Sequence, residues 1–219
     1  MLNNPFAFNP LSEARTPQQD RLFDYFFGDE KRHAVIHGPE CGATVGGLAL
    51  AVENILQRER DTVYVVPAVF KPIKLITEAV GYRAKSANNT VTASGSGAQI
   101  HFFQYKHFTS EIMADVKWGS VDLIIDSTWA YLNTPEQLLN AIDALQPDRM
   151  MTFDRAALRQ YPTGLTHPLL KVIERYNCRV VNLPSTESPL MKPESLAFYR
   201  QFAAQQGYDV QKYIAGELF

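Results

Sequence analysis

The segment that decides the fold is residues 33–44, which read HAVIHGPECGAT. It begins with a short apolar run typical of a buried strand, passes through a turn that contains Gly38 and Gly42, and leads into residues that favour a helix up to about Arg58. A strand, a glycine-bearing turn and a helix in this order present backbone N–H groups and a helix N-terminus to an anion. Such a turn is also a common packing device, so the segment alone leaves both interpretations open.

On both sides of this segment, expected strands alternate with expected helices. The expected strands are 33–36, 62–66, 121–125, 150–153 and 179–183, together with a hairpin at 90–105 that turns at Gly95-Ser96-Gly97. The expected helices are 17–27, the residues that follow the turn at 37–47, a helix beginning at Pro72, and 135–145, 168–176 and 193–205. Because several strands are continuously apolar, we predict a mostly parallel sheet covered on both faces. We expect one α/β domain over residues 1–219, with 1–15 as an irregular lead-in.

The composition limits the function. The chain has 219 residues, 46% of them hydrophobic, which is enough to bury a core. Its 21 Lys and Arg stand against 23 Asp and Glu, and a formal charge of -2 removes the simplest argument for nucleic-acid binding. No apolar run reaches the ~18 residues that a membrane span needs, and the first residues do not resemble a secretory signal. With two cysteines and no disulfide framework, we interpret the chain as a cytoplasmic protein with reduced thiols.

Residues 37–44 match part of the Walker A pattern, G-x-x-x-x-G-K-[ST]. They keep Gly42 and Thr44, but His37 stands in place of the first Gly and Ala43 in place of the Lys. The missing Lys is the serious loss, because its ammonium normally bridges the phosphates and no neighbour in the sequence clearly replaces it.

Two further segments raise the interest of this loop. Asp126 ends an apolar strand, where a P-loop ATPase of the additional-strand type holds Mg²⁺ through water; alternatively, Asp126 only turns the chain at the strand end. Ser127 occupies the place of the Glu that polarises the attacking water, and its hydroxyl is a poor base at neutral pH. We expect Thr152 to end the next strand, where such folds put a residue that senses the γ-phosphate, although a Thr is also ordinary there.

Taken in order, these elements resemble the N-terminal ATPase domain of the tailed-phage terminase large subunit, the DNA-packaging motor. The resemblance runs from about Thr16 to Phe219 and rests on order and spacing more than on any single motif. It implies a P-loop NTPase fold, a three-layer α/β sandwich with a mostly parallel central sheet. It also implies ATP and Mg²⁺ as cofactors.

The same resemblance implies a role for each candidate residue. Gln18 or Gln19, ahead of the first strand, would contact the adenine base, and Thr44 and Asp126 would lie beside Mg²⁺. Thr152 would belong to the coupling motif that links hydrolysis to movement. The loop residues that would bind the nucleotide are Gly38, Gly42, Ala43 and Thr44.

The departures from the family pattern predict impaired hydrolysis. Ala43 and Ser127 remove the Lys and the Glu, and the nuclease domain of the family is expected to be absent. The resemblance implies double-stranded DNA, a portal or a small terminase subunit as partners, a homo-oligomer, no membrane, and the host cytoplasm as the location. Two alternatives remain: a non-catalytic module that binds a portal, motor or other protein, and an active hydrolase that takes a Lys from elsewhere, such as Lys31 or a neighbouring subunit.

Two other features bear on the interpretation. The stretch 149–179 is locally basic, which fits a DNA-facing or partner-facing surface, a motor arginine, or a solvated helix face. Its basic residues are Arg149, Arg155, Arg159, Lys171, Arg175 and Arg179. Cys41 lies at the start of a helix, a position that is expected to lower the pKa of its thiol; we interpret it as a spectator in a variable position.

Overall fold

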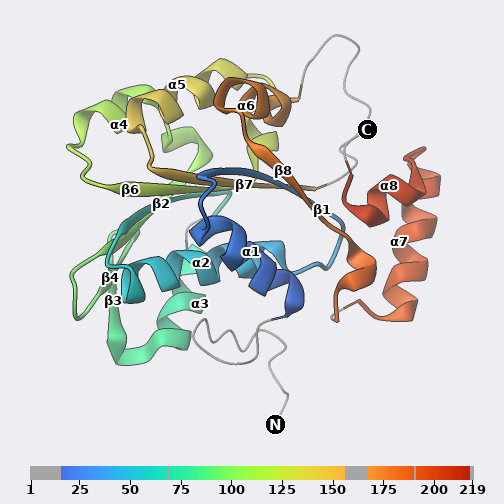
Figure 1. The fold of residues 1–219 in the computed structure, drawn as a ribbon, viewed down its shortest axis with the longest axis horizontal. Coiled ribbons are helices and arrows are strands. Elements are labelled where there is room, and N and C mark those ends of the chain that lie inside the picture. Colours follow the sequence, from blue (N-terminus) through green and yellow to red (C-terminus); the bar gives the residue numbers. More distant parts are fainter. Residues whose placement is uncertain (1–15, 69, 156–166, 190, 218–219) are drawn as a thin grey trace.

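The computed structural model describes residues 16–68, 70–155, 167–189 and 191–217. The expected lead-in 1–15 and Arg159 lie outside the described residues. Within them, strands and helices alternate along the chain and build a sheet with helices on both faces (Figure 1). This arrangement confirms the predicted α/β class.

Eight strands of the described chain form one sheet in the order β3-β4-β5-β2-β6-β7-β1-β8. The pairs from β5 through β2, β6, β7 and β1 to β8 are parallel, whereas β3 pairs with β4 and β4 with β5 in antiparallel fashion. Strand β7, which contains the expected strand 150–153, lies between β1 and β6. The strands are β1 (Arg32–His37), β2 (Asp61–Val66), β3 (Ala84–Ala87), β4 (Thr90–Ala93), β5 (Gln99–Gln104), β6 (Val121–Asp126), β7 (Arg149–Arg155) and β8 (Arg179–Leu183).

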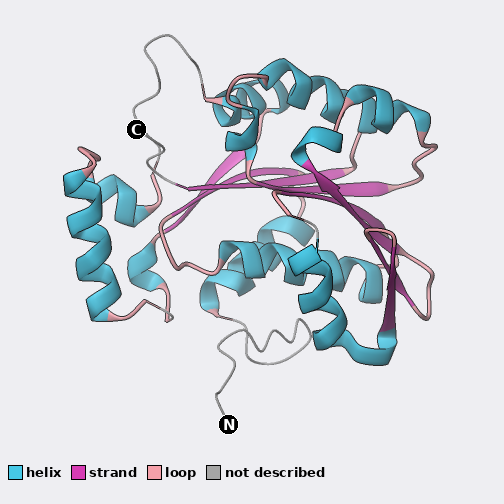
Figure 2. Ribbon diagram, turned by 180° about the vertical axis from the view of Figure 1, so that it is seen from behind, coloured by secondary structure: helices cyan, strands magenta, loops and turns pink. Residues whose placement is uncertain are grey.

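Helices cover the two faces of the sheet separately. One face carries α1 (Pro17–Phe27), α2 (Ala43–Gln57) and α3 (Phe70–Val80); the other carries α4 (Ser110–Asp115), α5 (Pro135–Leu145) and α6 (Pro168–Tyr176), as Figures 1 and 2 show. Each face has its own buried apolar cluster, because the side chains of the central strands alternate between the two. Helices α7 (Pro193–Gln205) and α8 (Val210–Ala215) pack on each other beside the β8 end of the sheet (Figure 1).

Local sequence explains how the helices next to β1 begin. Thr16 and Gln19 form a capping box at the start of α1, with Pro17 in the first turn. Helix α2 begins at Ala43, so Gly46 and Gly47 belong to the helix and not to the turn expected at 37–47. A Cβ on Gly46 would lie 2.7 Å from a Leu22 methyl carbon. The missing side chain there lets α1 pack closely on α2.

The structure differs from the sequence predictions at short segments. Strand β3 and the short helices α4 and α8 were not predicted, because each is too short to reveal a period. Strand β7 continues to Arg155 instead of ending at Thr152. Asp154 and Arg155 resemble a polar turn in the sequence, yet both pair with β1 in the sheet.

Candidate functional site

The glycine-bearing loop lies at the carboxyl edge of the sheet, between the end of β1 at His37 and the start of α2 at Ala43. Gly42 takes a left-handed conformation with φ of 76°, and Glu40 has φ of 53°. The tight turn aims the N-terminus of a 15-residue helix across the end of the sheet. A helix end of this kind offers unpaired N–H groups to an anion.

The outer side of the loop is fastened to the segment that follows β8. The Ser185 hydroxyl donates to the Pro39 carbonyl at 2.6 Å, and the Ser188 hydroxyl donates to the Glu40 carbonyl at 2.7 Å. The Tyr199 hydroxyl of α7 donates to the Glu40 carboxylate at 3.2 Å. The two serine bonds thus satisfy the carbonyls of Pro39 and Glu40, and the tyrosine bond holds the Glu40 side chain.

Gly38 is held in a space that excludes any side chain. Its N–H donates to the Leu183 carbonyl at 3.0 Å. A Cβ at this position would come within 2.2 Å of the Ser185 Oγ and 2.7 Å of the Ile214 carbonyl oxygen. Close packing against β8 and α8 is therefore the reason for glycine at position 38.

Thr44 and Asp126 meet across the loop. The Thr44 side chain, in the first turn of α2, lies close enough to the Asp126 carboxylate at the end of β6 to act on its pKa. Burial raises the pKa of Asp126, while Thr44 and the charge of Arg155 act in the opposite direction. The fold thus brings together the two side chains that the sequence analysis assigned to a Mg²⁺ site.

Ser127 is committed to a buried carboxylate. Its hydroxyl donates to the Asp154 Oδ1 at 2.6 Å, and the same carboxylate accepts from the Thr128 N–H at 3.0 Å and from the Thr128 hydroxyl at 3.1 Å. Burial raises the pKa of Asp154 to about 7, against the effect of these donors. The Ser127 hydroxyl is therefore already engaged on the sheet side of the site.

Tyr105 fixes the backbone after Asp126. Its hydroxyl donates to the Asp126 carbonyl at 2.5 Å and accepts the Ser127 N–H at 2.8 Å. The peptide bond between Asp126 and Ser127 is cis. The sequence analysis did not single out Tyr105, because its contact with β6 joins residues far apart in the chain.

Strand β7 brings a cation close to the loop. Arg155 lies opposite His37 in the register of β7 and β1, and its charge acts on the pKa values of Asp126, His37 and Cys41. Ala43, where Walker A has Lys, is only 3% exposed and packs in the core beneath α2. The sequence analysis named Arg155 within a basic group but could not choose it. Its alternation with Phe153, which faces α2, is the signal that distinguishes it.

The expected lowering of the pKa of the Cys41 thiol is wrong. Burial raises the pKa of its thiol to about 11, although the backbone N–H groups of Cys41 and Ala43 act to lower it. The thiol is 1% exposed, so desolvation of the thiolate outweighs the helix N-terminus.

Thr152 does not lie at the edge of the sheet. It pairs with Ala34 and Ile125 inside the sheet, is fully buried, and its hydroxyl has no partner among the described residues. Met151 and Phe153 face α2, so alternation places Thr152 on the opposite face. The structure does not bring Thr152 to the loop.

The two glutamines of α1 differ. The Gln19 side chain is used in the capping box, where its Oε1 accepts the Thr16 N–H at 3.0 Å. Gln18 is buried and donates through Nε2 to the Pro184 carbonyl at 2.6 Å, next to the segment that fastens the loop. Its Oε1 has no partner among the described residues. Gln18 therefore has a buried acceptor that could take a hydrogen bond from another group.

Most of the basic stretch 149–179 is engaged within the described chain. Arg149 donates to the Phe26 and Gly28 carbonyls at the end of α1. The remaining ion pairs are Lys171–Glu136, Arg175–Asp143 and Arg179–Glu30. These contacts favour an internally compensated surface for this part of the stretch.

The described residues also bear on two other features, a metal centre and a membrane-spanning helix. No group of three or more His, Cys, Asp or Glu side chains that could hold a metal ion occurs there. None of the described helices combines the length and the apolar character that a membrane crossing requires.

Comparison with known structures places the fold. The chain is similar to the large terminase of a thermophilic bacteriophage, with a TM-score of 0.65, 14% identity, and coverage of 92% of this chain and 53% of that one. A mutant of the large terminase ATPase domain from Thermus phage P74-26 matches with a TM-score of 0.54 and 12% identity over 94% of both chains. The Sulfolobus solfataricus SWI2/SNF2 ATPase core, solved in complex with dsDNA, matches with a TM-score of 0.52, 11% identity and 87% coverage of this chain.

These matches confirm the expected resemblance at the level of the fold. The chain has the α/β fold of phage large terminase ATPase domains and of a SWI2/SNF2 ATPase core. It spans about half the length of the thermophilic bacteriophage terminase. No protein-family model matches the chain, and comparison with curated proteins finds no significant match.

Proposed function

We propose that this chain is an ATPase domain of the terminase large-subunit type that binds Mg-ATP at residues 38–44 and hydrolyses it slowly. The observation that carries the proposal is the proximity of Thr44 to Asp126, which brings the first turn of α2 to the end of β6. Such a pair is unnecessary for packing, because Thr44 is exposed. The fold comparisons support the proposal, since the large terminase of the thermophilic bacteriophage has been solved in complexes with ADP and with ATP-gamma-S.

The donor set fits Mg²⁺. A carboxylate and a hydroxyl are hard oxygen ligands, and Mg²⁺ usually takes one or two protein ligands beside phosphate oxygens and water. Asp126 and Thr44 would hold the ion, and the ion would supply charge neutralisation at the phosphates. The backbone amides after Gly38 would bind the phosphate oxygens.

Gln18 would recognise the base. Its unpaired, buried Oε1 can accept a hydrogen bond from an exocyclic amine, such as that of adenine. The Nε2 bond to Pro184 fixes the orientation of the amide and ties it to the segment that fastens the loop. Gln19 would act on the base only by supporting α1.

Slow turnover follows from the side chains around the phosphates. Ala43 contributes no charge, and the Ser127 hydroxyl is bound to Asp154 instead of facing a water molecule. Positioned charges contribute about 10³-fold or more to phosphoryl transfer. Arg155 is the described cation best placed to offset part of this loss, because it already acts on Asp126.

The motor context is part of the same proposal. A terminase-type domain would act on double-stranded DNA, with a portal, a small terminase subunit and other copies of itself as partners, in the host cytoplasm. A second candidate function is a non-catalytic module that binds a protein partner. The fastening of Pro39 and Glu40 by Ser185 and Ser188 favours it, because these bonds hold the loop without any nucleotide.

The test is Mg-ATP binding and turnover by the unchanged chain, by Thr44→Val and by Ala43→Lys combined with Ser127→Glu. We expect the unchanged chain to bind Mg-ATP with near-background turnover, Thr44→Val to lose the Mg²⁺ dependence of binding, and the double variant to gain turnover. Thr77→Val is the matched control, since the Thr77 hydroxyl bonds only to carbonyls of its own helix.

Two outcomes would contradict the proposal in different ways. Turnover of ATP at motor-like rates by the unchanged chain would refute the proposed slow hydrolysis. Failure of every variant to bind nucleotide would refute the ATPase and support the binding module.

A further inference from the structure

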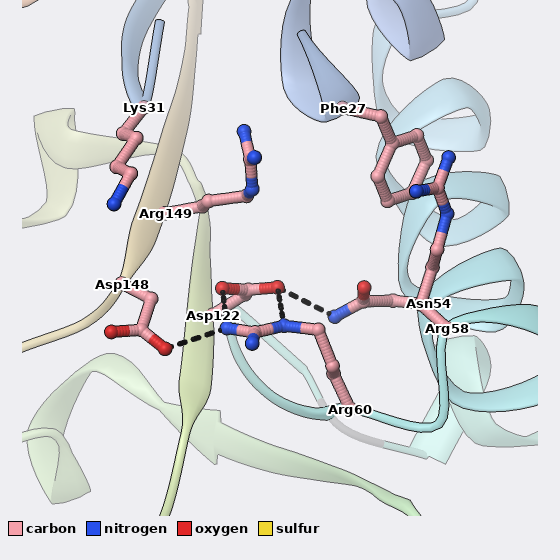
Figure 3. A pocket seen from close by; sticks show the side chains of 8 residues that line it. All are labelled: Phe27, Lys31, Asn54, Arg58, Arg60, Asp122, Asp148 and Arg149. Carbon is pink, nitrogen blue, oxygen red and sulfur yellow. Dashed lines mark hydrogen bonds and ion pairs between the residues drawn. The ribbon is translucent and has the colours of Figure 1, made fainter. Parts of the chain in front are cut away.

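A second polar site lies at the amino edge of the sheet, opposite the glycine loop. It is a pocket of about 290 Å³ between the ends of α1 and α2 and the starts of β6 and β7 (Figure 3). Phe27 and Arg58 form one wall, Lys31 and Arg149 the other, and Asn54 lies at its floor. The nucleotide proposal uses none of these residues.

Both carboxylates of the pocket are engaged by one arginine. Arg60 donates to Asp122 through Nε at 3.0 Å and through Nη2 at 2.8 Å. The same Nη2 donates to Asp148 at 2.7 Å. Asp122 is fully buried, so this ion pair compensates a charge that could not otherwise be desolvated.

Three further cations face the pocket without a carboxylate partner among the described residues. Arg149 uses Nη1 for the carbonyls of Phe26 and Gly28, which leaves its other N–H groups. The Arg58 guanidinium lies 4.6 Å from the centre of the Phe27 ring. Lys31 is exposed. With Arg60 counted, four cations stand against two carboxylates, a local charge of about +2 on a chain whose net charge is -2.

The floor of the pocket offers an unpaired acceptor. Asn54 donates through Nδ2 to the Thr62 hydroxyl and to Asp122, each at 2.9 Å. These bonds set the orientation of the amide, and its Oδ1 has no partner among the described residues although Asn54 is fully buried. Figure 3 shows the Asn54 oxygen turned away from Asp122, toward the space between Phe27 and Arg149. A buried acceptor without a donor is costly unless another group supplies one.

We propose that this pocket binds inorganic hydrogen phosphate. Lys31, Arg58 and Arg149 would bind the charged oxygens, and the P–O–H of the ligand would donate to the Asn54 Oδ1. Sulfate and phosphodiesters carry no such proton at neutral pH, and a phosphomonoester, whose second pKa is about 6, has mostly lost it. The acceptor therefore selects against sulfate and against a nucleic-acid backbone, although both are anions. The proposal does not rest on ATP binding at the glycine loop.

The experiment is a titration of the ¹⁵N-labelled full chain followed by NMR, which distinguishes the two edges of the sheet. We expect sodium phosphate to shift the amide signals of Lys31, Arg58 and Arg149 saturably. Sodium sulfate at equal ionic strength should bind at least about tenfold more weakly than phosphate, because it leaves the Asn54 acceptor unpaired. Glycerol 3-phosphate, which is mostly a dianion without a P–O–H at neutral pH, and a short DNA duplex should likewise bind more weakly than inorganic phosphate.

Variants test the side chains directly. Lys31→Gln combined with Arg58→Gln should weaken phosphate binding about tenfold or more, because two charge-assisted contacts are removed. Both residues are exposed, so the folded chain should keep its stability. Lys117→Gln, which removes an exposed charge outside the pocket, is the matched control and should leave the affinity unchanged.

Three results would overturn the proposal. These are equal affinity for phosphate and sulfate, saturable shifts confined to residues 38–44, and unchanged phosphate affinity in the double variant. Binding of the DNA duplex but not of phosphate would assign the pocket to nucleic acid instead.

Discussion

The two ends of helix α2 lie at opposite edges of the sheet and present opposite arrangements. At its N-terminus, the backbone of residues 38–44 has the form of an anion-binding loop, but the core position Ala43 contributes no charge. At its C-terminus, a pocket is surrounded by the charges of Lys31, Arg58 and Arg149. None of the described residues that line this pocket belongs to the first turn of a helix. The carboxyl edge therefore has the backbone form of an anion-binding loop without a lysine, and the amino edge has basic side chains without such a loop.

At the amino edge, the positive side chains lie where the helix dipole of α2 is negative. The C-terminal end of a helix carries partial negative charge, and Arg58 there is favourable even without a ligand. The N-terminal end is positive by itself, so a loop that has lost its Lys still attracts an anion weakly. The predictions that follow perturb one edge at a time.

The largest effect is expected at the amino edge, for Arg60→Met. The substitution leaves the fully buried Asp122 carboxylate without its bidentate partner. We expect a loss of about 3–5 kcal/mol in the free energy of unfolding, measured by urea denaturation. Adding Asp122→Asn should recover a large part of this loss. A loss below about 1 kcal/mol would show that the ion pair is not desolvated.

At the carboxyl edge, Asp154 is expected to make stability depend on pH. Its folded pKa of about 7 lies above the usual 3.8, so the native state binds a proton that the unfolded chain releases. This contribution is fully present below pH 3.8 and is lost as pH rises through 7, about 3 kcal/mol between pH 4 and 7.

Asp154→Asn should remove this dependence, which denaturation at a series of pH values measures. The variant should therefore be most destabilised relative to the unchanged chain at acid pH and least above pH 7. Parallel pH profiles for the two proteins would contradict the assignment.

A smaller effect is expected where the loop packs on β8. Gly38→Ala places a Cβ 2.2 Å from the Ser185 Oγ and 2.7 Å from a backbone oxygen of α8. We expect a loss of about 2 kcal/mol by overpacking, together with weaker nucleotide binding. Gly95→Ala is the control, because open space surrounds Gly95 and its stability should change by less than about 0.5 kcal/mol. Equal stability of the two variants would mean that the loop is not fastened as described.

The smallest effect is expected from the thiols. Burial raises the pKa of Cys41 and of Cys178 to about 11, so neither should react with Ellman's reagent at pH 8 in the native protein. Both should react after denaturation. Rapid reaction of Cys41 alone would show that the carboxyl edge opens while the rest of the sheet stays closed.

Strong local signals made most of the fold predictable. Helix α1 follows from its Thr16 cap and Pro17, and β6 from a run of apolar residues ending at Asp126. Strand β3 could not be predicted, because Ala84–Ala87 has little apolar character and is recognisable only by its pairing with β4. The end of β7 was misplaced because the apolar run ends at Phe153, whereas the pairing with β1 continues to Arg155.

The candidate site divides in the same way. Thr44 and Asp126 could be found because motif spacing marks them, and their roles stay a proposal. Asp154 could not be found, and Arg155 was named only within a basic group, since their contacts with Ser127 and with the loop depend on the register of β7. The amino-edge pocket left no signal in the sequence, because its cations come from separate elements brought together only by packing.

The bonds from Ser185, Ser188 and Tyr199 to the loop have a thermodynamic consequence. A molecule that displaces α7 must break the bond to Glu40, and a ligand that moves the loop must strain the same bond. Free-energy coupling between two binding events is reciprocal, so each must change the affinity for the other by the same factor. A partner that displaces α7 would therefore change the ligand affinity of the glycine loop, and a ligand that moves the loop would change the affinity for that partner.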